Sequence, residues 1–485
     1  MIPFNPADLA TMAPEIFLLG ATFAILLIDL FLRPSQRSVT HWLSLGVLTV
    51  TAVLVWNGAP AGGVVTPAFG GMFLLDAAGT LLKLFVLLTT ALVMLYGRSY
   101  MRDRGLLVGE LYLLMLFATI GMMLLVSAGS LVMVYLGLEL LTLSSYALVA
   151  LNRDSPLAAE AAIKYFVLGA LASGLLLYGM SMIYGATGTL DLASIRAAAD
   201  FSSANPHRNL LAFGLVFLVI GSAFKLGAAP FHMWLPDVYQ GAPTAVTLFI
   251  GSASKLAAFG LAWRLLDGAM GGMSAQWSPM LAMLAALSLA VGNLFAIVQG
   301  NLKRMLAYST ISHVGFLLLG FVGGTPEGYA AALFYVVSYA LMTTVSFGMV
   351  MLLAKAGFEA EEIDDFRGLN RRSPWYAGVM AIAMFSLAGV PPLLGFFAKL
   401  MVLKAAIDAG WLWLAVVGAV FAIIGLFYYL RVVKVMYFDP PADDAPLALP
   451  VDRGFRLILS LNGLALLVLG IFWSPLLDWC IRALS

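Results

Sequence analysis

Residues 223–236 read AFKLGAAPFHMWLP, and this segment interrupts a long apolar run. Two prolines and a glycine do not fit inside one regular helix, because proline lacks an N–H group and clashes with the preceding turn. Residues 387–399 read LAGVPPLLGFFAK and repeat the pattern, since both segments contain Gly-x-x-Pro with a lysine nearby. We therefore predict two broken helices, and we expect each break to be buried in protein or to line a water-filled path.

The composition indicates that the two broken helices belong to a membrane protein. Of 485 residues, 62% are hydrophobic and 11% are charged, and the mean hydropathy is +0.98, whereas soluble domains carry roughly 25% charged residues. The net charge of +1 gives no field that would hold nucleic acid. A single cysteine, Cys480, excludes an internal disulfide, an iron–sulfur cluster and a structural zinc site built on several cysteines. His232 and His313 remain as an alternative pair of haem ligands.

A helix that spans the bilayer needs about 20 apolar residues, and the chain contains about fourteen such runs. They lie near 13 to 32, 40 to 57, 72 to 96, 109 to 126, 129 to 151, 158 to 186, 210 to 239, 244 to 265, 278 to 299, 303 to 323, 327 to 354, 375 to 403, 411 to 438 and 455 to 477. Lys and Arg outside the runs concentrate in alternate loops, which the positive-inside rule assigns to the cytoplasm. The sequence thus predicts an all-α polytopic membrane protein with both termini in the periplasm.

The two broken runs are the seventh and the twelfth, and they occupy matching positions in the series. Paired interrupted spans of this kind are typical of transporters built from inverted repeats. We expect runs 4 to 8 and runs 9 to 13 to form two five-helix repeats of opposite orientation. The predicted parts are an N-terminal three-helix segment, 1–108, a first repeat, 109–268, an inverted second repeat, 278–438, and a C-terminal helix, 439–485.

Away from the ends of the predicted runs, the basic residues are lysines, and each such charge costs about 2.5 to 3.5 kcal/mol on insertion scales. They are Lys83, Lys164, Lys225, Lys255 and Lys399, and Glu139 is an acidic counterpart in the middle of its run. A buried lysine exchanges a proton far more readily than an arginine, so an ion path is the default interpretation. Two alternatives to a role in the ion path stay open. Lys164, four residues after Glu160, would extend its side chain to the membrane–water interface. Lys83 would form a pair with a residue of another helix.

An acidic segment between residues 359 and 365 lies outside the runs, beside Arg367, Arg371 and Arg372. We interpret it as a solvated loop or a docking edge. Ser and Thr residues near the breaks have two open readings, as water-holding groups or as helix packing contacts.

Two stretches resemble a known family. Residues 225–244, KLGAAPFHMWLPDVYQGAPT, and residues 302–313, LKRMLAYSTISH, are similar to signature segments of antiporter-like membrane subunits. Such subunits occur in proton-pumping NADH:quinone oxidoreductases (respiratory complex I), in related membrane hydrogenases and in multi-subunit sodium/proton antiporters. The resemblance covers nearly the whole chain and is closest to the smallest of the three complex I types. Lys399 stands where a second type has a glutamate, Glu139 fits the fifth span of the smallest type, and the long lateral helix of the third type does not follow the last run.

The resemblance implies a proton-translocating subunit of a NADH:quinone oxidoreductase in the bacterial inner membrane. It implies a proton path in which Glu139 pairs with Lys225, Lys255 connects the two halves and Lys399 lies on the exit side. Lys164, His313, His232 and Lys83 are further candidates. No cofactor is expected in this chain, whereas flavin, iron–sulfur clusters and quinone are expected in other subunits. The expected partners are the other membrane subunits, including neighbouring antiporter-like ones, together with the lipid bilayer and protons.

Three alternatives stay open. A stand-alone sodium/proton antiporter would exchange ions without NADH oxidation. A metabolite carrier would use the broken helices as a substrate site, although the runs contain arginine only toward their ends, where it would not clamp an anion at a central site, and the ionisable groups are spread over several runs. A purely structural scaffold leaves the buried lysines unexplained.

Overall fold

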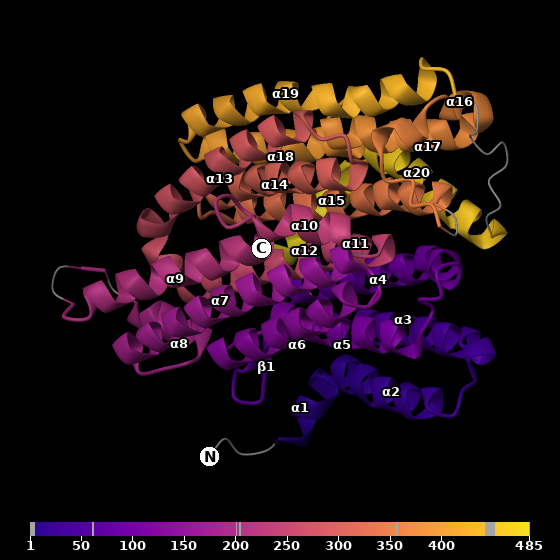
Figure 1. Ribbon diagram of the computed structural model, residues 1–485. Helices are drawn as coiled ribbons and strands as arrows, with labels where there is room; N and C mark the ends of the chain where they lie inside the picture. Colours follow the sequence, from indigo (N-terminus) through magenta and orange to yellow (C-terminus); the bar gives the residue numbers. More distant parts are fainter. Residues whose placement is uncertain are drawn as a thin grey trace.

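The helices lie side by side, broadly in the order of the sequence, as Figure 1 shows for this computed structural model. The structure describes residues 5–60, 63–199, 201–202, 205–354, 357–441 and 452–484. The N-terminal helices form one end of the row and α19 (Leu412–Tyr437) forms the other. α15 (Pro326–Leu353) runs through the middle, and its apolar segment is entirely buried.

Three long helices, one short helix, a 3-10 turn and a small hairpin make up the N-terminal end of the row. Its elements are α1 (Pro6–Thr11), α2 (Ala13–Asp29), the 3-10 turn η1 (Pro34–Gln36), α3 (Ser38–Asn57), β1 (Thr66–Ala68), β2 (Phe73–Leu75) and α4 (Ala77–Arg102). The two strands pair antiparallel, with Thr66 opposite Leu75. Asp76 ends the hairpin and begins α4, because its carboxylate accepts the N–H of Gly79 at 2.7 Å and so satisfies one of the free donors of the first turn.

The next group contains the first break. Its elements are α5 (Gly109–Val126), α6 (Leu131–Val149), α7 (Pro156–Thr187), α8 (Leu192–Ala198), α9 (Arg208–Leu226), α10 (Trp234–Gly241), α11 (Thr244–Gly251), α12 (Ala253–Trp263), the π-helical segment η2 (Arg264–Ala269) and the 3-10 turn η3 (Gly271–Met273). The predicted interruption of the seventh run is confirmed between α9 and α10. The eighth run is interrupted as well, at Ser252, although no proline marks that position.

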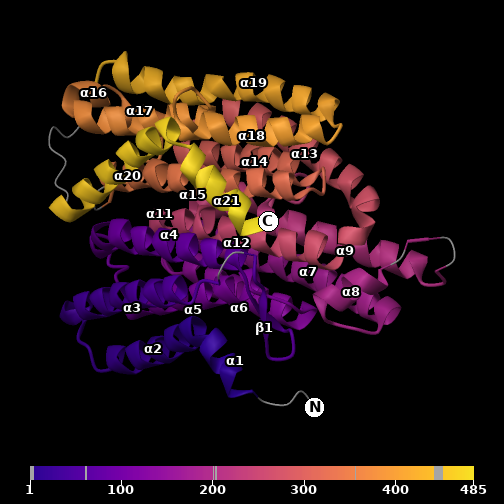
Figure 2. The ribbon, with the colours of Figure 1, turned by 180° about the vertical axis from the view of Figure 1, so that it is seen from behind.

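The remaining elements contain the second break. They are α13 (Ser274–Ile297), α14 (Leu302–Phe321), α15, the 3-10 turn η4 (Ile363–Phe366), α16 (Leu369–Arg372), α17 (Pro374–Ala388), α18 (Leu394–Asp408), α19, α20 (Arg453–Ile471) and α21 (Ser474–Leu484). The predicted interruption of the twelfth run is confirmed between α17 and α18. α21 runs obliquely across the row and packs against α4 and α15 (Figure 2).

Eleven helices within the described ranges are long and apolar enough to cross a membrane, judged by length and composition. The chain is therefore a mostly helical, multi-pass membrane protein. Three predicted runs fall outside this set for local reasons. α2 has 17 residues, α14 carries Lys303 and Arg304 in its first turn, and the twelfth run is divided into α17 and α18, with 15 residues each. The count of about fourteen crossings stays a prediction.

Lys83 on α4 is buried in an ion pair with Glu15 on α2. Its Nζ lies 2.6 Å from Oε1 of Glu15, and the two side chains are 2% and 1% exposed. The ammonium also lies 4.6 Å from the centre of the Phe73 ring. The reading in which Lys83 pairs with another helix is therefore confirmed, and the pair links α4 to α2, which packs on α3 and α5.

Removing one partner of this pair is expected to destabilise the protein by about 3–5 kcal/mol, because the remaining charge is left buried and uncompensated. Lys83→Met and Glu15→Leu should each lower the thermal stability of the solubilised complex, whereas the double variant should regain much of it. Thermal denaturation of the purified complex measures this difference. A double variant that is as unstable as the worse single variant would contradict the role of the pair.

Candidate functional site

At the first break, a lysine ammonium group binds the end of the interrupted helix. α9 stops at Gly227, whose φ of +86° is left-handed and suits glycine. The end of a helix leaves carbonyl groups without partners, and Nζ of Lys255 on α12 donates to one of them, the carbonyl oxygen of Leu226, at 2.6 Å. The same Nζ lies 5.2 Å from the centre of the Trp234 ring. A hydroxyl supports the other side of the break, because the N–H of Ala229 donates to Ser288 Oγ at 2.8 Å.

The second break has the same arrangement. α17 stops at Gly389, with a φ of +88°. Nζ of Lys399 on α18 donates to the carbonyl oxygen of Ala388 at 2.8 Å, and it lies 4.9 Å from the centre of the Phe316 ring. In both breaks a buried lysine thus binds the carbonyl that directly precedes a left-handed glycine. A carbonyl stabilises an ammonium without a full counter-charge, so each lysine remains able to give up its proton.

Lys225 lies in the last turn of α9, two residues before Gly227, and its surroundings differ from those of Lys255 and Lys399. Its side chain is buried, and Nζ has no hydrogen-bond partner among the described residues. Glu139 on α6 is the acidic group whose charge acts on it, and the Glu139 carboxylate itself accepts a hydrogen bond from Ser173 on α7. A cavity of about 10 Å³ is lined by Ser173, Thr142 and Lys225 among others, which is room for about one water molecule.

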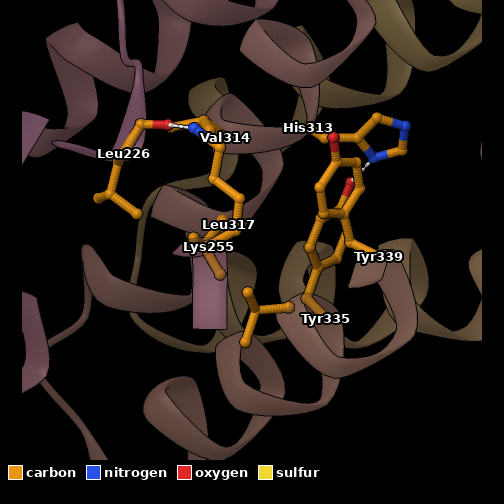
Figure 3. Close-up of a pocket in the computed structure, with 8 residues that line it drawn as sticks. Leu226, Lys255, His313, Val314, Leu317, Tyr335 and Tyr339 are labelled. Atoms are coloured by element: carbon orange, nitrogen blue, oxygen red, sulfur yellow. Dashed lines mark hydrogen bonds between the residues drawn. The ribbon is translucent and has the colours of Figure 1, made fainter. Parts of the chain in front are cut away.

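His313 on α14 lies between Lys255 and Lys399. Lys255 and His313 line one cavity of about 10 Å³, together with Tyr335 and Tyr339 (Figure 3). Nδ1 of His313 is 2.6 Å from the Tyr335 hydroxyl, and Nε2 is 3.0 Å from the Tyr429 hydroxyl. Both ring nitrogens are therefore engaged by hydroxyl groups, which argues against the haem alternative and favours transfer of protons along hydrogen bonds.

The hydroxyl groups around His313 form a connected network. Tyr429 is hydrogen-bonded to Ser309, and Thr310 is 2.7 Å from the Tyr339 hydroxyl. The charge of Lys399 also acts on His313. The tyrosines were not singled out from the sequence, because a tyrosine within an apolar helix is more often part of the core. Within the described residues, no group of three or more His, Cys, Asp and Glu side chains is placed to hold a metal ion.

The other candidate residues lie apart from this network. Lys164 is 43% exposed, and its Nζ is 2.8 Å from both Glu160 and Asp237. It therefore has the surface location that the sequence left open. His232 lies inside the first break, half-buried, with no partner on Nδ1 among the described residues. Lys83 is bound to Glu15 near the N-terminal end of the row.

Comparison with known proteins gives one consistent answer. Residues 128–425 match the family model described as "NADH:quinone oxidoreductase/Mrp antiporter, TM". The NADH-quinone oxidoreductase subunit N of Xanthomonas euvesicatoria is 57% identical over 485 residues, covering 100% of this chain and 98% of the relative. The protein of the same name from Thiobacillus denitrificans is 53% identical, with 100% and 99% covered.

The chain is also similar in fold to solved structures. A chain of respiratory complex I from Thermus thermophilus with bound aureothin has a TM-score of 0.81 at 32% identity, covering 96% of this chain and 98% of that one. A chain of the Mrp complex from Dietzia sp. has a TM-score of 0.86 at 21% identity, covering 98% and 97%, which shows a common fold. The expectation of the smallest complex I type is confirmed by the relatives. The chain belongs to the NADH:quinone oxidoreductase and Mrp antiporter family of membrane proteins, and within it to the NADH-quinone oxidoreductase subunit N proteins.

Proposed function

We propose that this chain translocates protons across the bacterial inner membrane as the antiporter-like subunit N of a NADH:quinone oxidoreductase. The observation that carries the proposal is the repeated geometry of the two breaks. In each break, a buried lysine ammonium donates a hydrogen bond to one backbone carbonyl, that of the residue before a left-handed glycine. Lysine is suited to this position because it can lose its proton there, whereas arginine would stay charged.

The proposed path runs from the Glu139 and Lys225 pair through Lys255 and His313 to Lys399. A nearby carboxylate stabilises a lysine ammonium, and weakening the pair favours release of the proton. Quinone reduction elsewhere in the complex would change this pairing. The cavity shared by Lys255 and His313 has room for about one water molecule, and in the proposed path this water would carry the proton between the two groups.

The finer architecture follows from the same reading. We infer about fourteen crossings, with inverted five-helix repeats at 109–268 and 278–438, an N-terminal segment at 1–108 and a C-terminal helix at 439–485. Residues 442–451 and 485 of that last part lie outside the described residues. The matching geometry of the two breaks supports the repeat, and the distribution of Lys and Arg supports periplasmic termini.

The rest of the reaction belongs to other subunits. Flavin, iron–sulfur clusters and quinone are expected there, and this chain is expected to contribute proton translocation alone. Its partners would be the other membrane subunits of the complex, including neighbouring antiporter-like subunits. Lys164, His232 and Lys83 are secondary candidates for the path, since none of them joins the network around His313.

Glu139→Gln is expected to reduce NADH-driven proton uptake into inverted membrane vesicles by about tenfold, which corresponds to about 1.4 kcal/mol of lost charge stabilisation. Glutamine retains an acceptor for the Ser173 hydroxyl but lacks the negative charge that acts on Lys225. NADH:ferricyanide activity of the same vesicles measures assembly of the complex. Glu327→Gln removes an exposed carboxylate from the first turn of α15 and serves as the matched control.

Wild-type uptake in Glu139→Gln vesicles, at unchanged assembly, would argue against the proposed path. Uptake that depends on sodium and proceeds without NADH would instead favour the stand-alone antiporter.

A further inference from the structure

The acidic segment after α15 is hydrogen-bonded to the start of α14. The N–H of Leu302 donates to the carbonyl oxygen of Glu361 at 2.6 Å, and the N–H of Ile363 donates to the carbonyl oxygen of Gly300 at 3.0 Å. Asn301 and Glu362 face each other as an isolated β-bridge. Residues 359–363 are therefore docked along the first turn of α14.

Glu359 fixes the other end of this segment. Its carboxylate accepts hydrogen bonds from Arg104 Nε at 2.5 Å and from the Tyr100 hydroxyl at 2.8 Å. The Tyr100 oxygen in turn accepts the N–H of Thr244, at the start of α11, at 3.1 Å. Glu359 and Glu361 are 39% and 27% exposed, so they are only partly solvated and have partners from distant parts of the chain, whereas Asp364 is 74% exposed as expected for a solvated loop. The docking edge stays a prediction.

Lys303 lies beneath the docked segment. Its side chain is 3% exposed, and its Nζ donates to the carbonyl oxygens of Gln240 at 3.0 Å and Ala242 at 2.8 Å, where α10 ends. Oε2 of Glu361 lies 3.8 Å from the same Nζ, and the Glu361 side chain is 27% exposed. The Glu361 side chain is therefore in contact with solvent and also lies close to the buried ammonium group of Lys303.

Polar groups continue from Lys303 toward His313. Thr247 Oγ1 donates to the carbonyl oxygen of Ala242 at 3.4 Å, so Thr247 and Lys303 share one acceptor. Lys303 and Thr310 lie seven residues apart on α14, about 10 Å along the helix axis. A cavity of about 10 Å³ lies at the height on α14 between these two residues. It is lined by Leu306, Ser309, Tyr339, Thr343, Ser346, Phe347 and Leu387. Thr310 is bonded to Tyr339, which lines the cavity beside His313.

We propose that Glu361 and Lys303 form a second proton-intake site, on the side predicted to be cytoplasmic, that loads the His313 end of the path in every turnover in which Lys225 also transfers a proton. This inference rests on the proposed function. A proton from water binds the Glu361 carboxylate, and Lys303 passes its own proton to water in the cavity lined by Ser309 and Tyr339, from which it reaches the His313 end of the path. The neutral amine then takes the proton of Glu361. One proton has moved inward, and both groups have returned to their starting state.

The surroundings of Glu361 suit proton uptake. Burial raises the pKa of the Glu361 carboxyl, the charge of Lys303 opposes this rise, and the carboxylates of Glu359 and Glu362 add to it. The positive charge of Arg104 also acts on Lys303. Because the carboxyl loses its proton as the pH rises, intake through this site should fall as the pH on that side increases.

Inverted vesicles test the site directly, because the predicted cytoplasmic face is then turned toward the external medium, whose pH is controlled. We expect Glu361→Gln to lower NADH-driven proton uptake by about tenfold or more, within the range for loss of an acid–base group, and to reduce its dependence on external pH. Glu361→Asp should recover much of the uptake. Asp364→Asn, which removes an exposed charge three residues away, should behave as wild type. NADH:ferricyanide activity again reports assembly.

Three results would overturn the proposal: wild-type uptake in Glu361→Gln, an equal loss in Asp364→Asn, or a loss by the same factor at every external pH, as a purely structural clamp would give. Lys225→Met separates this failure from failure of the proposed function. If Lys225→Met stops uptake while Glu361→Gln does not, the intake site is wrong and the function stands. If Lys225→Met leaves uptake normal as well, the proposed function fails.

Discussion

Lys225→Met is expected to lower NADH-driven proton uptake by about a hundredfold or more, which is the scale on which a positioned acid–base group acts. Lys225 has no hydrogen-bond partner among the described residues. Methionine is apolar and of similar length, and it removes the only titratable atom while leaving the packing around α9 nearly intact. The loss should therefore fall on proton transfer, with little effect on folding.

Two further variants sharpen this expectation. Lys225→Arg keeps the positive charge but cannot release a proton, so its uptake should fall nearly as far as that of Lys225→Met. Lys404→Met replaces an exposed lysine on α18 and should retain wild-type uptake. NADH:ferricyanide activity confirms assembly in each case. Normal uptake in assembled Lys225→Met vesicles would assign Lys225 a structural role and would bring the scaffold reading forward.

The breaks could be predicted from the sequence because their cause is local. Proline lacks an N–H group and glycine suits the left-handed conformation that ends a helix, so the paired Gly-x-x-Pro segments indicate the ends of α9 at Gly227 and of α17 at Gly389. The break at Ser252 has no such marker. α11 and α12 are separated there among fully buried neighbours, and packing of this kind leaves no local trace in a sequence.

The partners of the charged groups were harder to predict, because they come from distant positions. Lys83 could be recognised as a buried charge in need of a partner, but its contact with Glu15 depends on how α3 and α5 hold α2 and α4 together. The partners of the acidic segment could not be predicted for the same reason. Glu359 meets Arg104 across 255 residues of chain, and composition alone makes such a cluster resemble a solvated loop.

The residue types of the site were visible in the sequence, whereas its geometry was not. Lysines in apolar runs indicated an ion path on energetic grounds. The contacts of Lys255 and Lys399 with the last carbonyls of two broken helices needed coordinates, since each lysine lies on a different helix from the carbonyl it binds. Tyr335 and Tyr429 join the network only because α15 and α19 bring them against His313.

Lys399→Met is expected to lower proton uptake by about a hundredfold as well, but with an additional cost in stability. The carbonyl of Ala388 would lose its ammonium donor, and an unsatisfied buried acceptor costs about 1–3 kcal/mol. Lys255→Met should show the same two effects at Leu226, whereas Lys225→Met should show only the first. Thermal denaturation of the solubilised complex, compared with uptake in vesicles, separates the two contributions.

A glutamate at position 399 distinguishes proton transfer from carbonyl binding. Lys399→Glu restores a titratable group but cannot bind the Ala388 carbonyl in its ionised form, since both would be acceptors. We therefore expect partial recovery of uptake relative to Lys399→Met, together with a stability that stays below wild type. If Lys399→Glu and Lys399→Met are equally inactive while both complexes are as stable as wild type, Lys399 acts through its fixed positive charge, and the path must leave the membrane by another residue.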